Sequence, residues 1–232
     1  MSGLLVAATL GAVSPRSGAM EKMRIGVIGA GSLGCTVGSV WVKAGHDVMF
    51  SSRHPDELQS MARALGSRAS VGTTQQAAKF GTILLFAVPY DALEALGRDL
   101  QTDIRGKIVV DACNPSAANQ PSIAAKLGTK VVGEMKKKLL TGARLVRAFS
   151  AVDATSVNAS FERASGRLGV PVASDDVAAL EVVAALVRDA GCEPVITGDL
   201  STSSRFQRGT PAFRGNTNAE HLKRLLSQSN LT

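Results

Sequence analysis

The stretch Met23 to Gly34, Met-Arg-Ile-Gly-Val-Ile-Gly-Ala-Gly-Ser-Leu-Gly, constrains the fold more than any other part of the chain. Arg24 to Ile28 is short, apolar and β-branched, which predicts a buried strand. Glycines follow at GxGxxG spacing, and a helical pattern then runs from Ser32 to about Ala44. Because a strand precedes the glycines and a helix follows them, the motif predicts dinucleotide binding rather than an ordinary glycine turn.

Each glycine of the motif has its own physical role. Gly29 permits a tight turn off the strand, Gly31 lets the backbone come close to a pyrophosphate, and Gly34 lets the helix lie near the sheet. The helix directs its unpaired N–H groups and the positive end of its dipole toward the phosphates. We therefore expect Ser32 and Leu33 to contribute to the phosphate site.

The end of the second predicted strand, Asp47 to Ser51, indicates which nucleotide is bound. An NAD site would place Asp or Glu here to hold the ribose hydroxyls, but this chain has Ser51, Ser52 and Arg53. Hydroxyls and a guanidinium bind a 2′-phosphate, whereas a carboxylate would repel it. The sequence therefore predicts NADP(H), with a surface loop that happens to be basic as the alternative.

Two later strands end in residues that suit the nicotinamide half of the nucleotide. Thr82 to Val88 is a continuous apolar strand, and Lys107 to Asp111 is the fifth predicted strand. Ligands of a doubly wound sheet bind beyond the carboxyl ends of its strands. We therefore expect Ala87, Val88, Pro89 and Asn114 to lie there, although Pro89 alone also suits a plain helix start.

Strand and helix patterns alternate from Met23 to Thr197, which predicts one α/β domain with a doubly wound, mostly parallel, Rossmann-like sheet. The other expected helices are Pro55 to Leu65, Thr73 to Lys79, Tyr90 to Leu100, Val132 to Leu140, Asp175 to Ala190 and Ala219 to Ser227. The other expected strands are Ala69 to Gly72, Arg144 to Phe149, Val170 to Ala173 and Glu193 to Thr197. We assign residues 23–197 to the NADP-binding domain and residues 198–232 to a small C-terminal helical extension.

Composition excludes several other classes. The net charge is +7, but the basic residues are scattered apart from Lys136-Lys137-Lys138, which predicts a solvated helix face rather than a nucleic-acid site. Three cysteines without a CxxC and three unclustered histidines predict no metal site and a reducing compartment, the cytoplasm. No apolar run approaches the length of a membrane span, so we expect no membrane partner.

The first 22 residues permit two interpretations. Gly3 to Val13 is apolar, and Ser17-Gly18-Ala19 resembles a cleavage site, but no basic residue precedes Arg16. We favour a disordered or wrongly assigned leader over an export signal.

From Met23 onward the chain resembles the NADP-dependent reductases of coenzyme F420, a deazaflavin, and related dinucleotide-binding oxidoreductases. The matching stretches are Ile25 to Gly34, Ser51-Ser52-Arg53, Ala87-Val88-Pro89, Asp111 to Pro115, Ala143 to Ser150 and Gly198 to Arg205. The resemblance implies that Ser150, Leu200 and Arg205 border a second pocket, which the C-terminal segment completes. It also implies a homodimer.

The resemblance implies hydride transfer between NADP(H) and coenzyme F420, or a flavin such as FMN or FAD. Two bound ring cofactors carry this chemistry themselves, so we expect no catalytic acid or base. Two alternatives stay open. One is NADPH-dependent reduction of a carbonyl, an imine or a ferric-flavin substrate, with Tyr90 as the available proton donor. The other is a non-catalytic NADP(H) sensor.

Overall fold

The computed structural model describes residues 22–115 and 132–229, so the expected leader, apart from Lys22, and the expected loop from Ser116 to Lys130 lie outside it. Eight strands form one sheet in the order β3-β2-β1-β4-β5-β6-β7-β8. The strands are β1 (Arg24–Ile28), β2 (Asp47–Ser51), β3 (Ala69–Gly72), β4 (Ile83–Phe86), β5 (Ile108–Asp111), β6 (Arg144–Arg147), β7 (Gly169–Ala173) and β8 (Glu193–Gly198).

The pairing of the strands confirms the predicted doubly wound, mostly parallel sheet. Strands β1 to β6 all run parallel to one another, and the strand order reverses between β1 and β4. The chain turns over between β6 and β7, which pair antiparallel through Arg147 and Ala173 alone, and β7 and β8 then run parallel to each other. The carboxyl ends of the first six strands therefore share one edge of the sheet, where a doubly wound fold binds its ligand.

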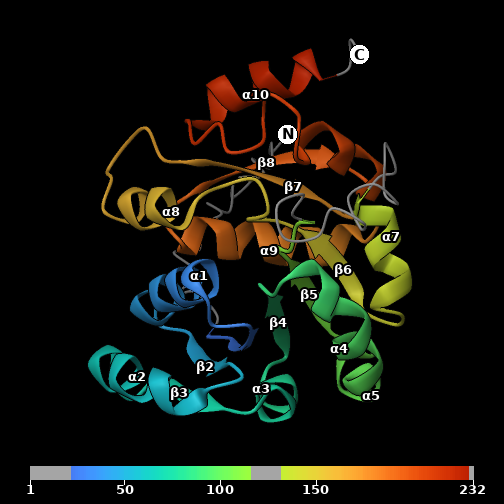
Figure 1. The fold of residues 1–232 in the computed structure, drawn as a ribbon. Coiled ribbons are helices and arrows are strands. Elements are labelled where there is room, and N and C mark those ends of the chain that lie inside the picture. Colours follow the sequence, from blue (N-terminus) through green and yellow to red (C-terminus); the bar gives the residue numbers. More distant parts are fainter. Residues whose placement is uncertain (1–21, 116–131, 230–232) are drawn as a thin grey trace, which may run out of the picture.

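Helices cover both faces of the sheet (Figure 1). They are α1 (Ser32–Lys43), η1 (Pro55–Leu58), α2 (Gln59–Leu65), α3 (Thr74–Phe80), η2 (Tyr90–Ala92), α4 (Leu93–Asp99), α5 (Gln101–Ile104), α7 (Val132–Leu139), α8 (Ala154–Phe161), α9 (Val177–Asp189), η3 (Leu200–Phe206) and α10 (Ala219–Gln228). The buried apolar side chains form two main clusters, one on each face. A third, smaller cluster lies under α10, which covers β7 and β8 in Figure 1.

Local chemistry explains where these elements begin and how they are held. Thr73 caps α3: its hydroxyl accepts from the Gln76 N–H at 3.2 Å, and the Gln76 side chain accepts from the Thr73 N–H at 2.8 Å. On the opposite face, the buried Trp41 indole donates to the Leu186 carbonyl at 2.8 Å and so joins α1 to α9. The Trp41 hydrogen bond therefore links the nucleotide-binding half to the later part of the chain.

The structure differs from the expected elements at helix starts and in the polar segments. The helices expected from Pro55 and from Tyr90 each begin as a short 3-10 turn. Helix α8 and the 3-10 helix η3 were not expected, because their Ser-, Thr- and Asn-rich sequences have weak helical propensity. Helix α8 is held mainly by packing against α1.

Within residues 22–115 and 132–229, no helix has the length and apolar character needed to cross a lipid bilayer.

Candidate active site

The glycine turn has the geometry that the sequence predicted for it. Gly29 has φ of +97°, and a Cβ there would lie 2.5 Å from the Val88 Cγ1. A Cβ on Gly34 would lie 2.1 Å from the Gly29 carbonyl oxygen, whereas a Cβ on Gly31 would meet nothing within 4 Å. Gly29 and Gly34 therefore pack the turn against the sheet, and Gly31 leaves an open, exposed face.

The first turn of α1 fits a phosphate group. Gly31 occupies the N-cap position and supplies no side-chain cap, and no acidic residue lies in the first turn. Ser32 is exposed and Leu33 is half-buried. Free N–H groups at the start of a 12-residue helix bind anions through their hydrogen-bonding capacity and the helix dipole. The backbone of these residues would hold the pyrophosphate.

The predicted 2′-phosphate residues at the end of β2 are not equivalent. Ser51 is fully buried, and its hydroxyl donates to the Val27 carbonyl at 2.8 Å. The prediction that this hydroxyl binds the 2′-phosphate is therefore wrong. The Ser51 carbonyl instead accepts from the Ala30 N–H at 2.8 Å and braces the glycine turn. Ser52 is half-buried and Arg53 is exposed, and Arg53 forms no ion pair with the described residues. A 2′-phosphate would bind through Ser52 and Arg53.

The residues predicted for the nicotinamide half lie at the ends of three neighbouring strands. Ala87 and Val88 are half-buried after β4, and Pro89 is exposed at the N-cap of η2. Asn114, after β5, donates from its Nδ2 to the Ser150 carbonyl at 2.5 Å. The structure therefore brings Asn114 and Ser150 together, although 36 residues separate them in the sequence.

A buried ionic cluster lies beneath the carboxyl ends of these strands, and the sequence pattern did not predict it. Asp111, Lys136 and Arg147 are all fully buried. The Lys136 Nζ lies 2.8 and 2.7 Å from the two Asp111 carboxylate oxygens, and the Arg147 Nη1 donates to Asp111 at 2.7 Å. The prediction that Lys136 belongs to a solvated helix face is therefore wrong. We refer to these three residues as the ionic cluster.

The ionic cluster is connected to Asn114. The Arg147 Nη2 donates to the Asn114 side-chain oxygen at 2.7 Å, and both Arg147 and Lys136 also donate to the Cys113 carbonyl. Arg147 therefore fixes the amide orientation of Asn114, so that its Nδ2 faces Ser150. This makes Arg147 a positioning residue for the predicted site.

Burial and charge shift the pKa values of Lys136, Asp111 and Cys113. Burial, followed by the charge of Arg147, lowers the pKa of Lys136 to about 8 despite the paired carboxylate. Burial alone would raise the pKa of Asp111, but Lys136 and Arg147 outweigh it and hold this pKa below its usual range. Burial raises the pKa of Cys113 to about 12, so this thiol stays neutral.

The depressed pKa of Lys136 predicts a pH-dependent stability. Lys136 holds its proton less tightly in the folded state than in the unfolded chain, so burying its charge destabilises the fold fully below about pH 8. This penalty disappears as the pH rises toward about 10.5, where the unfolded lysine also loses its proton. We expect the unfolding free energy of the wild type, relative to Lys136→Met, to rise by on the order of 3 kcal/mol between pH 7 and 10.5. Urea titrations of both proteins across this range would measure it, and a constant difference would contradict it.

Backbone strain marks the end of β6. Phe149 has φ of +59°, a conformation that costs a bulky residue on the order of 1–3 kcal/mol. Its fully buried ring is held edge-on to Trp41, with 5.8 Å between the ring centroids. The strained turn places Ser150 beside Asn114, and the buried Ser150 hydroxyl has no partner among the described residues. An unpaired buried hydroxyl at a strand end suits a ligand contact.

The C-terminal segment returns to the same edge of the sheet. Leu200 belongs to the apolar cluster that contains Tyr90 and Cys113. The Arg147 guanidinium carbon lies 6.0 Å from the Phe206 ring centroid, and the Arg208 Nε donates to the Pro115 carbonyl at 3.3 Å. The segment that the resemblance assigned to a second pocket therefore lies against the ionic cluster.

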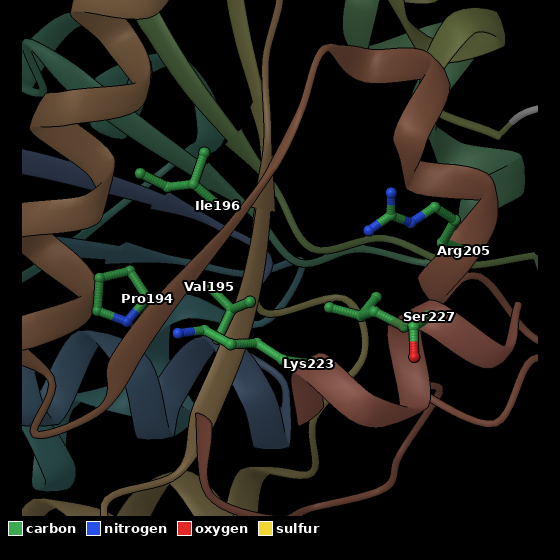
Figure 2. A pocket seen from close by; sticks show the side chains of 7 residues that line it. Pro194, Val195, Ile196, Arg205, Lys223 and Ser227 are labelled. Atoms are coloured by element: carbon green, nitrogen blue, oxygen red, sulfur yellow. The ribbon is translucent and has the colours of Figure 1, made fainter. Parts of the chain in front are cut away.

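Arg205 borders a hollow beside the C-terminal helix α10. It lines a hollow of about 430 Å³ between β8 and α10, together with Ile196, Lys223 and Ser227 (Figure 2). Neither Asn114 nor Ser150 lines this hollow. Arg205 therefore borders a hollow that these two strand-end residues do not line.

Comparison with known proteins identifies the nucleotide-binding part of the chain. Residues 24–115 match the family described as NADP oxidoreductase, coenzyme F420-dependent, which confirms the resemblance found in the sequence. The matched residues contain the glycine turn and make up about two fifths of the chain. Protein YjhV of Escherichia coli (strain K12) is 44% identical over 52 residues, which are 22% of this chain and 38% of YjhV. The chain therefore matches about two fifths of the length of this relative.

Two solved structures share the fold over most of the chain. Protein SMa0349 from Sinorhizobium meliloti is 25% identical, with a TM-score of 0.70 over 86% of this chain and 94% of that one. A protein from Arthrobacter sp. FB24, described as a candidate F420-dependent NADP reductase, is 23% identical, with a TM-score of 0.65 over 78% of this chain and 87% of that one. These similarities confirm the Rossmann-like architecture.

Proposed function

Starting from the match of residues 24–115 to the coenzyme F420-dependent NADP oxidoreductases, we propose that this protein transfers a hydride between NADP(H) and a second ring cofactor, a deazaflavin of the F420 type or a flavin. The observation that carries the proposal is the glycine turn, with its open face at Gly31 and the exposed cation of Arg53 near the end of β2. The turn suits a pyrophosphate and the cation suits a 2′-phosphate.

The residues of this chain bind and orient rather than react. NADPH supplies a hydride from its nicotinamide ring, and the acceptor ring takes up this hydride and one proton from solvent. Ser52, Arg53 and the α1 N-terminus would hold the nucleotide, while Asn114 and Ser150 would border the nicotinamide. Holding two rings in a reactive geometry lowers the barrier by several kcal/mol without an acid or base.

The test is acceptor reduction by the purified full chain under anaerobic conditions. NADPH is mixed with coenzyme F420, FMN or FAD, and the loss of the reduced-nicotinamide absorbance is followed together with the reduction of the acceptor. We expect turnover with one of these rings. If NADPH binds but no ring acceptor is reduced, the proposal is wrong.

The same assay separates the alternatives. A small-substrate reductase would oxidise NADPH with a carbonyl, cyclic imine or ferric-flavin compound, and it would need a proton donor. Tyr90 is buried and its hydroxyl has no partner among the described residues, which favours this candidate as the second choice. A sensor would bind both redox forms and consume neither.

The cofactor preference gives a further prediction. Replacing Ser52 by Asp and Arg53 by Ala together removes a cation and adds a carboxylate where the 2′-phosphate would bind. We expect NADPH binding to weaken by about 2–4 kcal/mol and NADH binding to change little. Calorimetric titration measures both, with Arg105→Ala, an exposed arginine at the amino end of β5, as a control for lost charge. An equal loss for both nucleotides would contradict the NADP assignment.

A further inference from the structure

The ionic cluster carries an unbalanced charge. It contains two cations, Lys136 and Arg147, and one carboxylate, Asp111, and all three side chains are fully buried. Both cations hydrogen-bond the same carboxylate. The cluster therefore holds a net single positive charge below about pH 8, inside a region where water does not screen it.

No other charge among the described residues neutralises the cluster. Its other contacts are uncharged: the Cys113 backbone, the Asn114 amide oxygen, the Phe206 ring and the Tyr90 ring, whose centroid lies 5.5 Å from the Lys136 Nζ. The Arg147 Nε has no partner among these residues. The nearby acidic groups are engaged elsewhere: Asp175 pairs with Lys137 at 2.6 Å, and Asp176 pairs with Arg144 at 2.7 Å.

The charge lies beside the predicted nicotinamide position. Arg147 contacts Asn114, and Asn114 contacts Ser150, at the carboxyl ends of β5 and β6. The 2′-phosphate end of the nucleotide is expected at β2, on the other side of the β1–β4 reversal, and a dinucleotide spans this crevice. The nicotinamide half would then face the ionic cluster.

We propose that the ionic cluster makes the site discriminate between the two redox states of its nucleotide and bind NADPH more tightly than NADP⁺. The inference rests on the proposed function, since it requires a nicotinamide nucleotide at the strand ends. The nicotinamide ring is neutral in NADPH and positively charged in NADP⁺, so the net charge of the cluster repels only the oxidised form. At an effective dielectric constant of about 20, a unit charge about 10 Å from another like charge changes a dissociation constant on the order of tenfold.

The difference in affinity between NADPH and NADP⁺ favours one direction of hydride transfer. The bound nucleotide couple shifts toward NADPH by the same factor, because binding and redox equilibria form one thermodynamic cycle. Hydride transfer onto NADP⁺ is then favoured on the protein, and NADP⁺ formed in the reverse direction leaves readily.

The test compares the ratio of dissociation constants, NADP⁺ over NADPH, in three full-length proteins at pH 7. Lys136→Met removes one cation and leaves Asp111 and Arg147 as a neutral pair. Lys138→Met removes the same charge from an exposed position on the same helix. We expect the ratio to fall about tenfold in Lys136→Met and to match the wild type in Lys138→Met. An unchanged ratio in Lys136→Met overturns the inference.

A second measurement on the wild type does not depend on a variant folding. Raising the pH from 7 to 9.5 neutralises Lys136, while Asp111 stays ionised and Cys113 stays protonated. Tyr90, whose pKa is raised by burial and by Asp111, also stays neutral. We expect the ratio to fall toward its Lys136→Met value, and a pH-independent ratio overturns the inference. Failure of the wild type to bind either nucleotide would instead refute the proposed function.

Discussion

Replacing Gly31 by valine is expected to abolish useful NADPH binding while leaving the fold intact. A Cβ at Gly31 meets nothing within 4 Å, so the larger side chain causes no clash within the protein. It would instead fill the space where the pyrophosphate approaches the backbone. Losing two charge-assisted hydrogen bonds weakens NADPH binding on the order of a hundredfold or more. Calorimetric titration measures the affinity, and thermal unfolding measures the stability.

Gly34→Ala is the matched comparison, because this substitution in the same motif is expected to reduce stability rather than to block the nucleotide. Its Cβ would lie 2.1 Å from the Gly29 carbonyl oxygen, a backbone atom that cannot rotate away. Helix α1 must then move, which we expect to cost about 3 kcal/mol or more in unfolding free energy. The prediction fails if Gly31→Val destabilises the protein as much as Gly34→Ala, or if Gly31→Val binds NADPH normally.

Asp111→Asn is expected to produce the largest loss of stability. The substitution leaves two buried cations without their shared carboxylate. Breaking a buried pair in this way costs about 3–5 kcal/mol, because an uncompensated charge stays in the interior. A chain of this size should then unfold roughly 10 °C lower. Scanning calorimetry and urea unfolding would measure both quantities.

Lys136→Met provides the control for this prediction. It leaves Asp111 paired with Arg147 at 2.7 Å, so charge balance improves while a side chain of similar length fills the space. We expect its unfolding free energy at pH 7 to equal or exceed that of the wild type. If Lys136→Met is as unstable as Asp111→Asn, the cluster is held by packing rather than by charge.

The sequence predicts the nucleotide-binding half well, because its information is local. The glycine spacing and the apolar strand from Arg24 to Ile28 define the turn without reference to the rest of the chain. Thr73 with Gln76 likewise forms a capping box within four residues. The position of Ser51 at the end of a strand predicts a ligand contact for its hydroxyl. Sequence position does not show that this hydroxyl instead donates to the Val27 carbonyl.

The ionic cluster depends on contacts between distant segments, which a single sequence does not show. Two features of the sequence nevertheless point to the ionic cluster. Asp111 ends an otherwise apolar buried strand, so its carboxylate requires a partner. Lys136 is four residues before the buried Leu140 and therefore lies on the inward face of its helix. The run of three lysines concealed this position, because charged runs are usually solvated.

The single antiparallel bridge between β6 and β7 has a consequence for how such proteins diversify. Six strands with continuous ladders carry the glycine turn, and among the described residues the two strands that follow pair with this ladder only at Arg147 and Ala173. Exchanges confined to the segment from Leu200 to Arg208, which lies beyond this bridge and against the ionic cluster, would leave the ladders of β1 to β6 in place. We therefore expect relatives of this protein to vary more in this segment than in the strands that carry the glycine turn.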